Sequence, residues 1–118
     1  MPAETKPVSE IAWSDGDSGR VDGVRFRLAD VDAPEIGSSA QCDKERVLGR
    51  ASKTFFESIT ANGDVKMVDW GEVDRYDRKV IDLLIGEHSL VDVGIANGHL
   101  QPWTHIDGSS IGPKPDWC

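Results

Sequence analysis

The chain has 118 residues, of which 38% are hydrophobic and 29% are charged. This length suits one small domain with a single modest core and excludes two domains, and no apolar run approaches the ~18 residues that a membrane span needs. Thirteen basic and twenty-one acidic residues give a net charge of −8. Such acidity argues against a stable clamp on nucleic acid, because clamps of that kind neutralise phosphates with a basic surface.

The N-terminal part of the chain is expected to be a lead-in followed by strands. Residues 1–7 are polar, include two prolines and are expected to be disordered. Val8–Trp13 is expected to form a short strand, and Arg20–Val31 has the clearest β pattern. Within it, Asp22-Gly23 is a favoured two-residue hairpin turn. Apolar residues then alternate with other residues, at Val24, Phe26 and Leu28.

One long helix is expected over Asp43–Ala61. Apolar residues recur there at steps of three and four, at Val47, Leu48, Ala51, Phe55 and Ile59. Asp43 is a suitable N-cap, and Asn62-Gly63 a suitable stop. Gly49 inside the helix costs about 1 kcal/mol relative to alanine.

The second half of the chain is expected to alternate strands and a short helix. Val65–Trp70 and Lys79–Ile85 are expected strands joined by the polar segment Gly71–Arg78, and Leu90–Asn97 is an expected short helix. Residues 104–118 lack periodicity and are expected to be a loop-like tail packed on the same domain. Five short strands with one main helix and a second short helix predict an α+β fold, a small OB-fold-like β-barrel over residues 8–103.

Residues that suit phosphodiester chemistry occur in three short segments. Carboxylates in Asp15-Gly16-Asp17 and Asp32-Ala33-Pro34-Glu35 suit a hard cation such as Ca²⁺. Arg27 and Arg78 suit a forked grip on a phosphate, and a third carboxylate suits the positioning of a water. Each segment alone also fits an ordinary turn or an exposed strand. The three histidines lack a metal-ligand spacing, and the four tryptophans are expected to pack in the protein.

An EF-hand is excluded as the source of the acidic pattern. Counted from Asp15, the sixth position is Arg20 and the twelfth is Phe26, whereas a calcium loop of that kind requires Gly and Glu there. The carboxylates therefore need another explanation.

The three segments together resemble the staphylococcal nuclease (thermonuclease) family. Phe26–Glu35 is similar to that family's most diagnostic segment, an arginine on a strand five residues before Asp-x-Pro-Glu. Asp15-Gly16-Asp17-Ser18 resembles an earlier Asp-Gly-Asp-Thr segment, and Asp74-Arg75-Tyr76-Asp77-Arg78 a later Asp-x-Tyr-Gly-Arg segment. The order and the spacing agree, and the resemblance covers roughly residues 8–103.

The resemblance implies a calcium site. Asp17 and Asp32 would bind Ca²⁺ through their carboxylates, and Ala33 would offer its backbone carbonyl. Asp15 would support the ion through water. Asp17, Asp32 and Glu35 bring a charge of −3, and Arg27 and Arg78 bring +2. The bare site of these five residues therefore has a charge of −1, so phosphate binding is expected to depend on the metal.

The resemblance also implies the catalytic residues. Glu35 would orient or deprotonate the attacking water, while Arg27 and Arg78 would hold the phosphate and stabilise the charge of the transition state. Tyr76 corresponds to a position beside the substrate. On a regular strand Arg27 and Asp32 would face opposite ways, so we expect the strand to bend, bulge or end before Asp32.

Three features depart from the family pattern. Asp77 replaces a glycine, which adds a negative charge and removes backbone freedom beside Arg78. Ser18 replaces a threonine. The family's third, C-terminal helix, which helps wall the substrate groove, has no counterpart in residues 104–118, so substrate affinity or preference is expected to differ.

The two cysteines, Cys42 and Cys118, allow two interpretations. They are either free thiols or one disulfide that ties the end of the chain to the segment before the helix. A disulfide would contribute roughly 3–5 kcal/mol and would favour an extracytoplasmic location, periplasmic or secreted. The first residues show no signal peptide.

By resemblance we expect a calcium-dependent nuclease, an endonuclease-type hydrolase that cuts DNA and/or RNA and leaves 3′-phosphate ends. The alternative is a non-catalytic nuclease-like OB-fold module for binding or interaction, favoured by Asp77 and the acidic surface. The intact set of two aspartates, one glutamate and two arginines opposes it. A calcium-binding structural domain without a nucleic-acid partner is a third interpretation. Nucleic acid is the expected partner, no membrane is expected, and a monomer is assumed.

Overall fold

The computed structural model describes residues 3–107 and 109–118, which form one mixed sheet, two helices and two short strand pairs. The strands of the sheet are β1 (Glu4–Pro7), β2 (Ile11–Trp13), β3 (Ser18–Val21), β4 (Val24–Leu28), β6 (Val65–Val73), β7 (Lys79–Ile85) and β8 (His88–Ser89). The helices are α1 (Asp43–Thr60) and α2 (Leu90–Ala96). The strand pairs are β5 (Val31–Asp32) with β9 (Gln101–Pro102), and β10 (His105–Ile106) with β11 (Ser109–Ser110).

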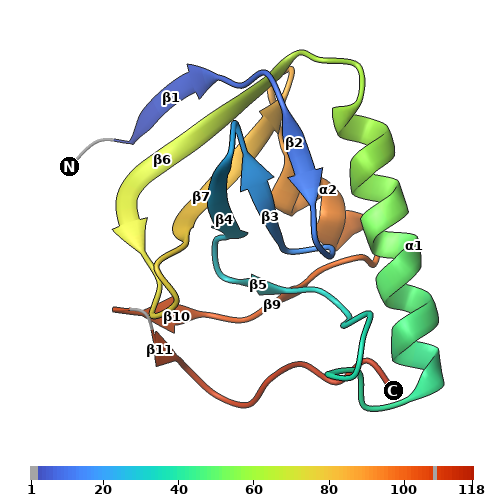
Figure 1. Cartoon of the computed structure of the whole chain (residues 1–118). Helices are drawn as coiled ribbons and strands as arrows, with labels where there is room; N and C mark the ends of the chain where they lie inside the picture. Colours follow the sequence, from blue (N-terminus) through green and yellow to red (C-terminus); the bar gives the residue numbers. More distant parts are fainter. Residues whose placement is uncertain (1–2, 108) are drawn as a thin grey trace.

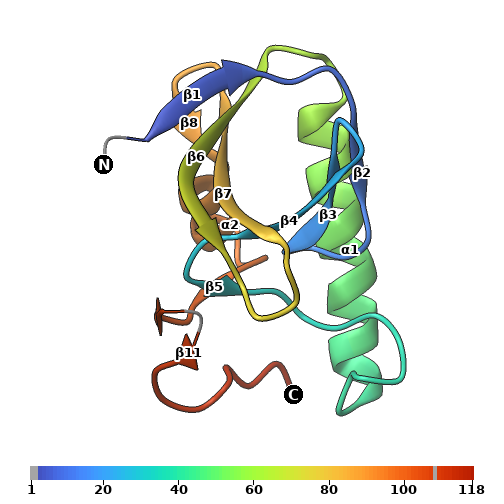
Figure 2. The same ribbon diagram turned by 60° about the vertical axis from the view of Figure 1, so that its left-hand side comes forward.

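The sheet curls into a barrel-like shape. Its order is β1-β6-β7-β4-β3-β2, with β8 beside β7, and the only parallel pair in the described sheet is β4–β7. The edge strands β1 and β2 follow one another in the chain, so the segment from β1 to β2 bridges the two edges without closing a continuous ladder (Figures 1 and 2). The predicted α+β fold of OB-like type is confirmed, with seven sheet strands in place of five.

The prediction of a disordered lead-in over residues 1–7 is wrong for Glu4–Pro7, while Met1 and Pro2 lie outside the described residues. β1 pairs antiparallel with β6, from Glu4 opposite Asp69 to Pro7 opposite Lys66. All four side chains of β1 are exposed. Backbone hydrogen bonds to β6 hold this edge strand in place. They leave no trace in the pattern of polar and apolar side chains, so the strand could not be predicted from that pattern.

The predicted hairpin is present between β3 and β4. Asp22 and Gly23 have φ values of 47° and 82°, the two positive values that a tight hairpin turn of this type needs. Phe26 and Leu28 of β4 are fully buried, whereas Val24 is exposed. The hairpin therefore places Arg27 on the face opposite to the core side chains.

Helix α1 has nearly the predicted bounds, but its fully buried residues are not those of the predicted stripe, of which only Phe55 and Ile59 pack partly buried against the core. Cys42, not Asp43, is the N-cap, and its Sγ accepts a hydrogen bond from a backbone N–H of the first turn. Val47 is 62% exposed. The buried residues are Glu45, Gly49, Ser52 and Phe56. The predicted stripe therefore holds only in the C-terminal half of the helix, which meets the core, because the N-terminal half packs on polar backbone.

The core lies between the curled sheet and the two helices. Trp13 packs edge-on against Phe26 and stacks on Phe56, with ring centroids 5.4 and 5.3 Å apart. Leu90 of α2 is also fully buried in this cluster. Neither described helix combines the length and the apolar character that crossing a membrane would take.

The tail after β9 crosses the base of the molecule (Figure 1). Apart from β10 and β11, its described residues have no regular structure. Trp117 is 8% exposed, and Cys118 forms a disulfide with Cys42, with the two Cα atoms 6.2 Å apart. The tail is thereby fixed beside the N-terminus of α1.

Candidate active site

The loop between β2 and β3 places Asp17 in the interior. Asp15 Oδ1 accepts hydrogen bonds from Asp17 N at 3.1 Å and Ser18 Oγ at 2.9 Å, which tightens the turn. Gly16 is required for close packing, because a Cβ there would lie 2.9 Å from Ala33 Cβ. Asp17 is only 3% exposed, and its Oδ2 accepts a hydrogen bond from Ala33 N at 2.9 Å.

A turn after β4 brings Arg27 and the Asp32 segment together. Asp30 has a φ of 56°, so the chain changes direction there and β5 starts afresh. The strand thus ends in a left-handed turn before Asp32, and no bulge is needed. Arg27 Nη2 donates to Val31 O at 2.9 Å, and its Nη1 lies 3.6 Å from Asp17 Oδ2.

Asp32 is bound by two groups of the C-terminal tail. It is 1% exposed, and its Oδ2 accepts hydrogen bonds from Trp117 Nε1 at 2.8 Å and Lys114 Nζ at 2.9 Å. Lys114 Nζ is also 3.9 Å from Glu35 Oε1. Desolvation lowers the pKa of Lys114, but the hydrogen bond to Asp32 and the surrounding carboxylates outweigh it and raise that pKa. The tail therefore brings a charged ammonium to the acidic residues.

Helix α1 holds the segment that carries Glu35. Glu45 Oε2 accepts a hydrogen bond from Glu35 N, and Glu45 Oε1 accepts one from Gln41 N, both at 2.9 Å. Desolvation raises the pKa of Glu45, but these backbone N–H groups outweigh it and lower that pKa. At Gly49 a Cβ would lie 2.7 Å from Glu35 O, so this glycine lets the segment lie directly on the helix.

Burial opposes the charge of two of the predicted acids. Burial, first, and then the neighbouring Asp15 raise the pKa of Asp17 well above its usual range, although Arg27 opposes this. Burial, followed by Asp15, also raises the pKa of Glu35, and Lys114 opposes it. Both acids would accordingly be stabilised in their charged form by an added cation.

The third segment is a turn between β6 and β7. Asp74 Oδ1 accepts hydrogen bonds from Tyr76 N and Arg78 N, each at 2.9 Å, and its Oδ2 accepts one from Arg78 Nε at 2.7 Å. The Arg78 guanidinium lies 5.3 Å from the centroid of the Tyr76 ring, which is 60% exposed. Asp77 has a φ of 63°, so it occupies the left-handed conformation that glycine would adopt.

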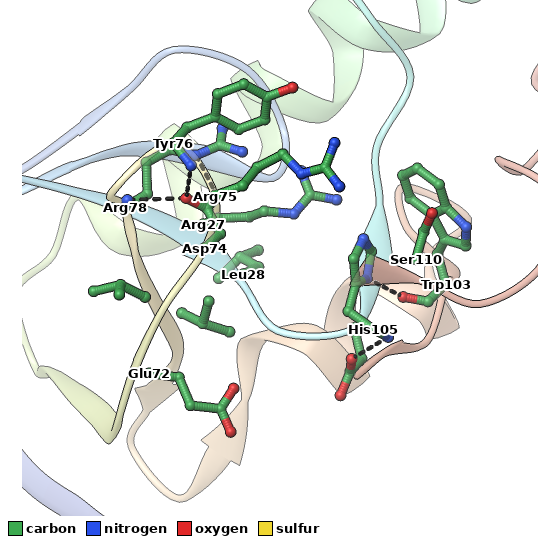
Figure 3. Close-up of a pocket in the computed structure, with 13 residues that line it drawn as sticks. Arg27, Leu28, Glu72, Asp74, Arg75, Tyr76, Arg78, Trp103, His105 and Ser110 are labelled. Carbon is green, nitrogen blue, oxygen red and sulfur yellow. Dashed lines mark hydrogen bonds and ion pairs between the residues drawn. The ribbon is translucent and has the colours of Figure 1, made fainter. Parts of the chain in front are cut away.

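Arg27 and Arg78 line one pocket of about 200 Å³. Figure 3 shows the arginines and Tyr76 on one side of it and Trp103 with His105 on the other. The Arg27 guanidinium is 5.9 Å from the centroid of the Trp103 ring. The pocket thus combines cationic and aromatic groups, which suit a phosphate and a base.

The predicted acids do not line the pocket of the arginines. Glu35 lines a second pocket of about 280 Å³ with Lys114 and Trp117, and Asp17 and Asp32 are almost fully buried. The contact between Arg27 and Asp17 joins the acidic residues to the arginine pocket.

The donor types fit a calcium ion, although both carboxylates already have a cation partner, Arg27 beside Asp17 and Lys114 on Asp32. Carboxylates at Asp17 and Asp32 and the carbonyl of Ala33 are the oxygen ligands that Ca²⁺ prefers, and Asp17 is a buried carboxylate whose charge a cation would stabilise. Within residues 3–107 and 109–118, no three His, Cys, Asp or Glu side chains are grouped as a metal site. Asp32 instead binds Lys114.

Sequence reasoning missed Lys114 and Glu45 and assigned Trp103 to packing. Lys114 lies between two prolines in a segment without periodicity, so nothing in the pattern pointed to the site. Glu45 lies in the first turn of α1, where a glutamate is ordinary on electrostatic grounds alone. Its role is apparent only in the structure, where the backbone N–H groups of Glu35 and Gln41 donate hydrogen bonds to its carboxylate.

The comparison with known families supports the resemblance. The model of the staphylococcal nuclease homologue family matches residues 25–104, more than half of the 118-residue chain. The matched range includes Arg27, Asp32, Glu35 and Arg78 and begins after Asp17. A search among curated proteins gave no significant match. The predicted resemblance is confirmed: this chain belongs to the staphylococcal nuclease homologue family.

Proposed function

We propose that this protein is a calcium-dependent nuclease that hydrolyses phosphodiester bonds of DNA and/or RNA and leaves 3′-phosphate ends. The observation that carries the proposal is the convergence of Arg27 and Arg78 on one pocket, with Arg27 also in contact with Asp17. Membership of a nuclease-like family supports nucleic acid as the partner.

Both arginines are held in place before any substrate binds. Arg27 donates a hydrogen bond to Val31 O, and Arg78 donates one to the Asp74 carboxylate. Each guanidinium has five N–H donors in a rigid fork, so these contacts leave donors for a phosphate. Positioning of this kind stabilises the charge of the transition state without a cost of reorganisation during the reaction.

Glu35 is the proposed base. Burial and the neighbouring Asp15 raise its pKa, which brings the carboxylate closer to the range in which a general base works best. It would take a proton from water while the water oxygen attacks phosphorus and the bond to the 5′ oxygen breaks. The leaving 5′ oxygen would take a proton from solvent.

Asp17, Asp32 and the carbonyl of Ala33 would hold the calcium ion, and Asp15 would support it through water. When bound, the ion would supply positive charge to the phosphoryl oxygens and to the attacking water. The hydrogen bond from Asp17 N to Asp15 Oδ1 supports this proposal, because it ties the two residues together in one turn.

A non-catalytic nuclease-like module is the second candidate, and the tail favours it. Lys114 and Trp117 both bind Asp32, and the net charge of −8 disfavours tight binding of nucleic acid. Such a module would bind a strand or another partner without cutting it.

Cleavage of single-stranded DNA and RNA, first with calcium and then with a chelator, tests the proposal. We expect cleavage only with calcium, and a loss of at least about 100-fold for Arg27→Ala, because charge stabilisation of the transition state is removed. Arg20→Ala removes an exposed arginine of β3 and should leave the rate unchanged. Treatment with a phosphatase should change the mobility of the products if they carry 3′-phosphates. Equal rates in the Arg27 and Arg20 variants would refute the assigned role.

We also propose an extracytoplasmic location, periplasmic or secreted. The Cys42–Cys118 disulfide is compatible with an extracellular protein, since disulfides persist outside the reducing cytosol.

A further inference from the structure

Lys114 reaches the acidic residues from a part of the chain that the family match does not include. The matched range ends at residue 104. Lys114 Nζ lies 2.9 Å from Asp32 Oδ2 and 3.9 Å from Glu35 Oε1, and its side chain is 37% exposed. One ammonium therefore binds a proposed metal ligand and lies close to the proposed base.

The tail is fixed on both sides of Lys114. Before it, Trp103 Nε1 donates to Gly112 O at 3.3 Å. After it, Gln101 Nε2 donates to Asp116 O at 3.0 Å, Trp117 Nε1 binds Asp32, and Cys118 is disulfide-bonded. Because these contacts hold the tail, the effective concentration of the ammonium at Asp32 is high.

We propose that Lys114 is a tethered cation that competes with a divalent metal ion for Asp32 and so sets the cation affinity of the site. Asp32 is almost fully buried, and a buried carboxylate requires a positive partner. A calcium ion that binds Asp32 must therefore displace Lys114 or share the carboxylate with it. Both events lower the apparent affinity of the site for calcium. This inference rests on the proposed function, in which Asp32 is a metal ligand.

Calcium titration by calorimetry compares the parent with Lys114→Met, which keeps the aliphatic stem and removes the charge. We expect the variant to bind calcium about tenfold more tightly or better, since a competing partner is removed. Lys66→Ala takes one exposed lysine from β6 and changes the net charge equally. It should bind calcium as the parent does.

Cys118→Ser provides an independent variant. It removes the disulfide that fixes the end of the tail, but it does not change the Lys114 side chain. Its calcium affinity should lie between those of the parent and Lys114→Met. If Lys114→Met binds calcium no more tightly than Lys66→Ala, the inference is wrong, whether or not the protein cuts nucleic acid. Tighter binding without any cleavage would support the inference and refute the nuclease.

Discussion

Asp77, which stands where the family pattern has glycine, lies in a hydrogen-bonded turn between β6 and β7. Asp77 keeps the left-handed conformation, with φ of 63°, and its N–H donates to Asp74 O at 3.0 Å. Aspartate is among the few residues that tolerate this region. The loss of backbone freedom expected from the sequence therefore costs free energy but does not prevent the left-handed turn.

Replacement of Asp77 by glycine should stabilise the protein by about 0.5–1 kcal/mol, because the strain of the left-handed residue exceeds the added entropy of the unfolded chain. Urea unfolding followed by circular dichroism measures this. Asp77→Asn separates charge from backbone, since asparagine also tolerates the left-handed region, and should match the parent. Equal gains in both variants would mean that charge, not strain, is responsible.

Asp74 should make the stability of the protein depend on acidic pH. Desolvation raises its pKa, but hydrogen bonds from Arg78 and Tyr76 outweigh it and lower the pKa from its ordinary value of 3.8. A lowered pKa in the folded state means that the contribution is complete above that ordinary value. It is lost as the pH falls through the folded-state pKa.

Asp74→Asn should accordingly be less stable than the parent by about 1–2 kcal/mol at pH 7, since bonds to a charged acceptor are lost. The difference should shrink below about pH 4. Urea midpoints at several pH values give this comparison, and Asp64→Asn, which changes an exposed carboxylate just before β6, is the control. A difference that stays constant down to strongly acidic pH would show that shape, not charge, matters at Asp74.

The sequence pointed to residues that lie in motifs of fixed spacing and missed contacts between residues far apart along the chain. Arg27 and Arg78 lie in ordered motifs, and the structure brings them to one pocket. Lys114 contacts Asp32 across 82 positions of the chain, and no local pattern encodes such a contact. Their catalytic and binding roles stay predictions.

At the scale of elements, hydrogen-bonding patterns that are local in sequence were predictable. The Asp22-Gly23 turn and the bounds of α1 follow from local preferences and are present. The buried face of α1 was not predictable, because Glu45 and Gly49 are buried by their contacts with the Glu35 segment. A helix that supports a polar site need not show an apolar stripe along its whole length.

Gly49→Ala tests whether α1 serves as the support of Glu35. Helix propensity alone predicts a gain of about 1 kcal/mol. The structure predicts a loss of about 1–3 kcal/mol from overpacking, because the added Cβ would lie 2.7 Å from Glu35 O and 2.9 Å from Pro34 O. Thermal unfolding decides between the two signs. Ser58→Ala, on an exposed position of the same helix, should gain slightly, and a gain at Gly49 as well would contradict the close approach.

At the scale of the whole molecule, contacts between segments far apart along the chain could not be predicted from the sequence. β1 pairs with β6 through backbone groups across 59 to 65 positions of the chain, and its exposed side chains gave no signal. The tail lacks the family's third helix in its described residues, and Trp117 with the disulfide fixes it instead. If the proposed nuclease activity holds, we therefore expect its substrate affinity or preference to differ from that implied by the resemblance.

Removal of the Cys42–Cys118 disulfide should cost about 4 kcal/mol, because the crosslink spans 76 residues and restricts the unfolded chain. The parent should show no reactive thiol when denatured without reductant. Cys118→Ser and the double variant with Cys42→Ser should unfold at the same urea concentration, since each removes the same crosslink and serine is itself a good N-cap. A double variant that is clearly less stable would mean that Cys42 contributes through the cap, where its Sγ accepts from Glu45 N at 3.4 Å. Two reactive thiols in the parent would remove both the crosslink and the argument for an extracytoplasmic location.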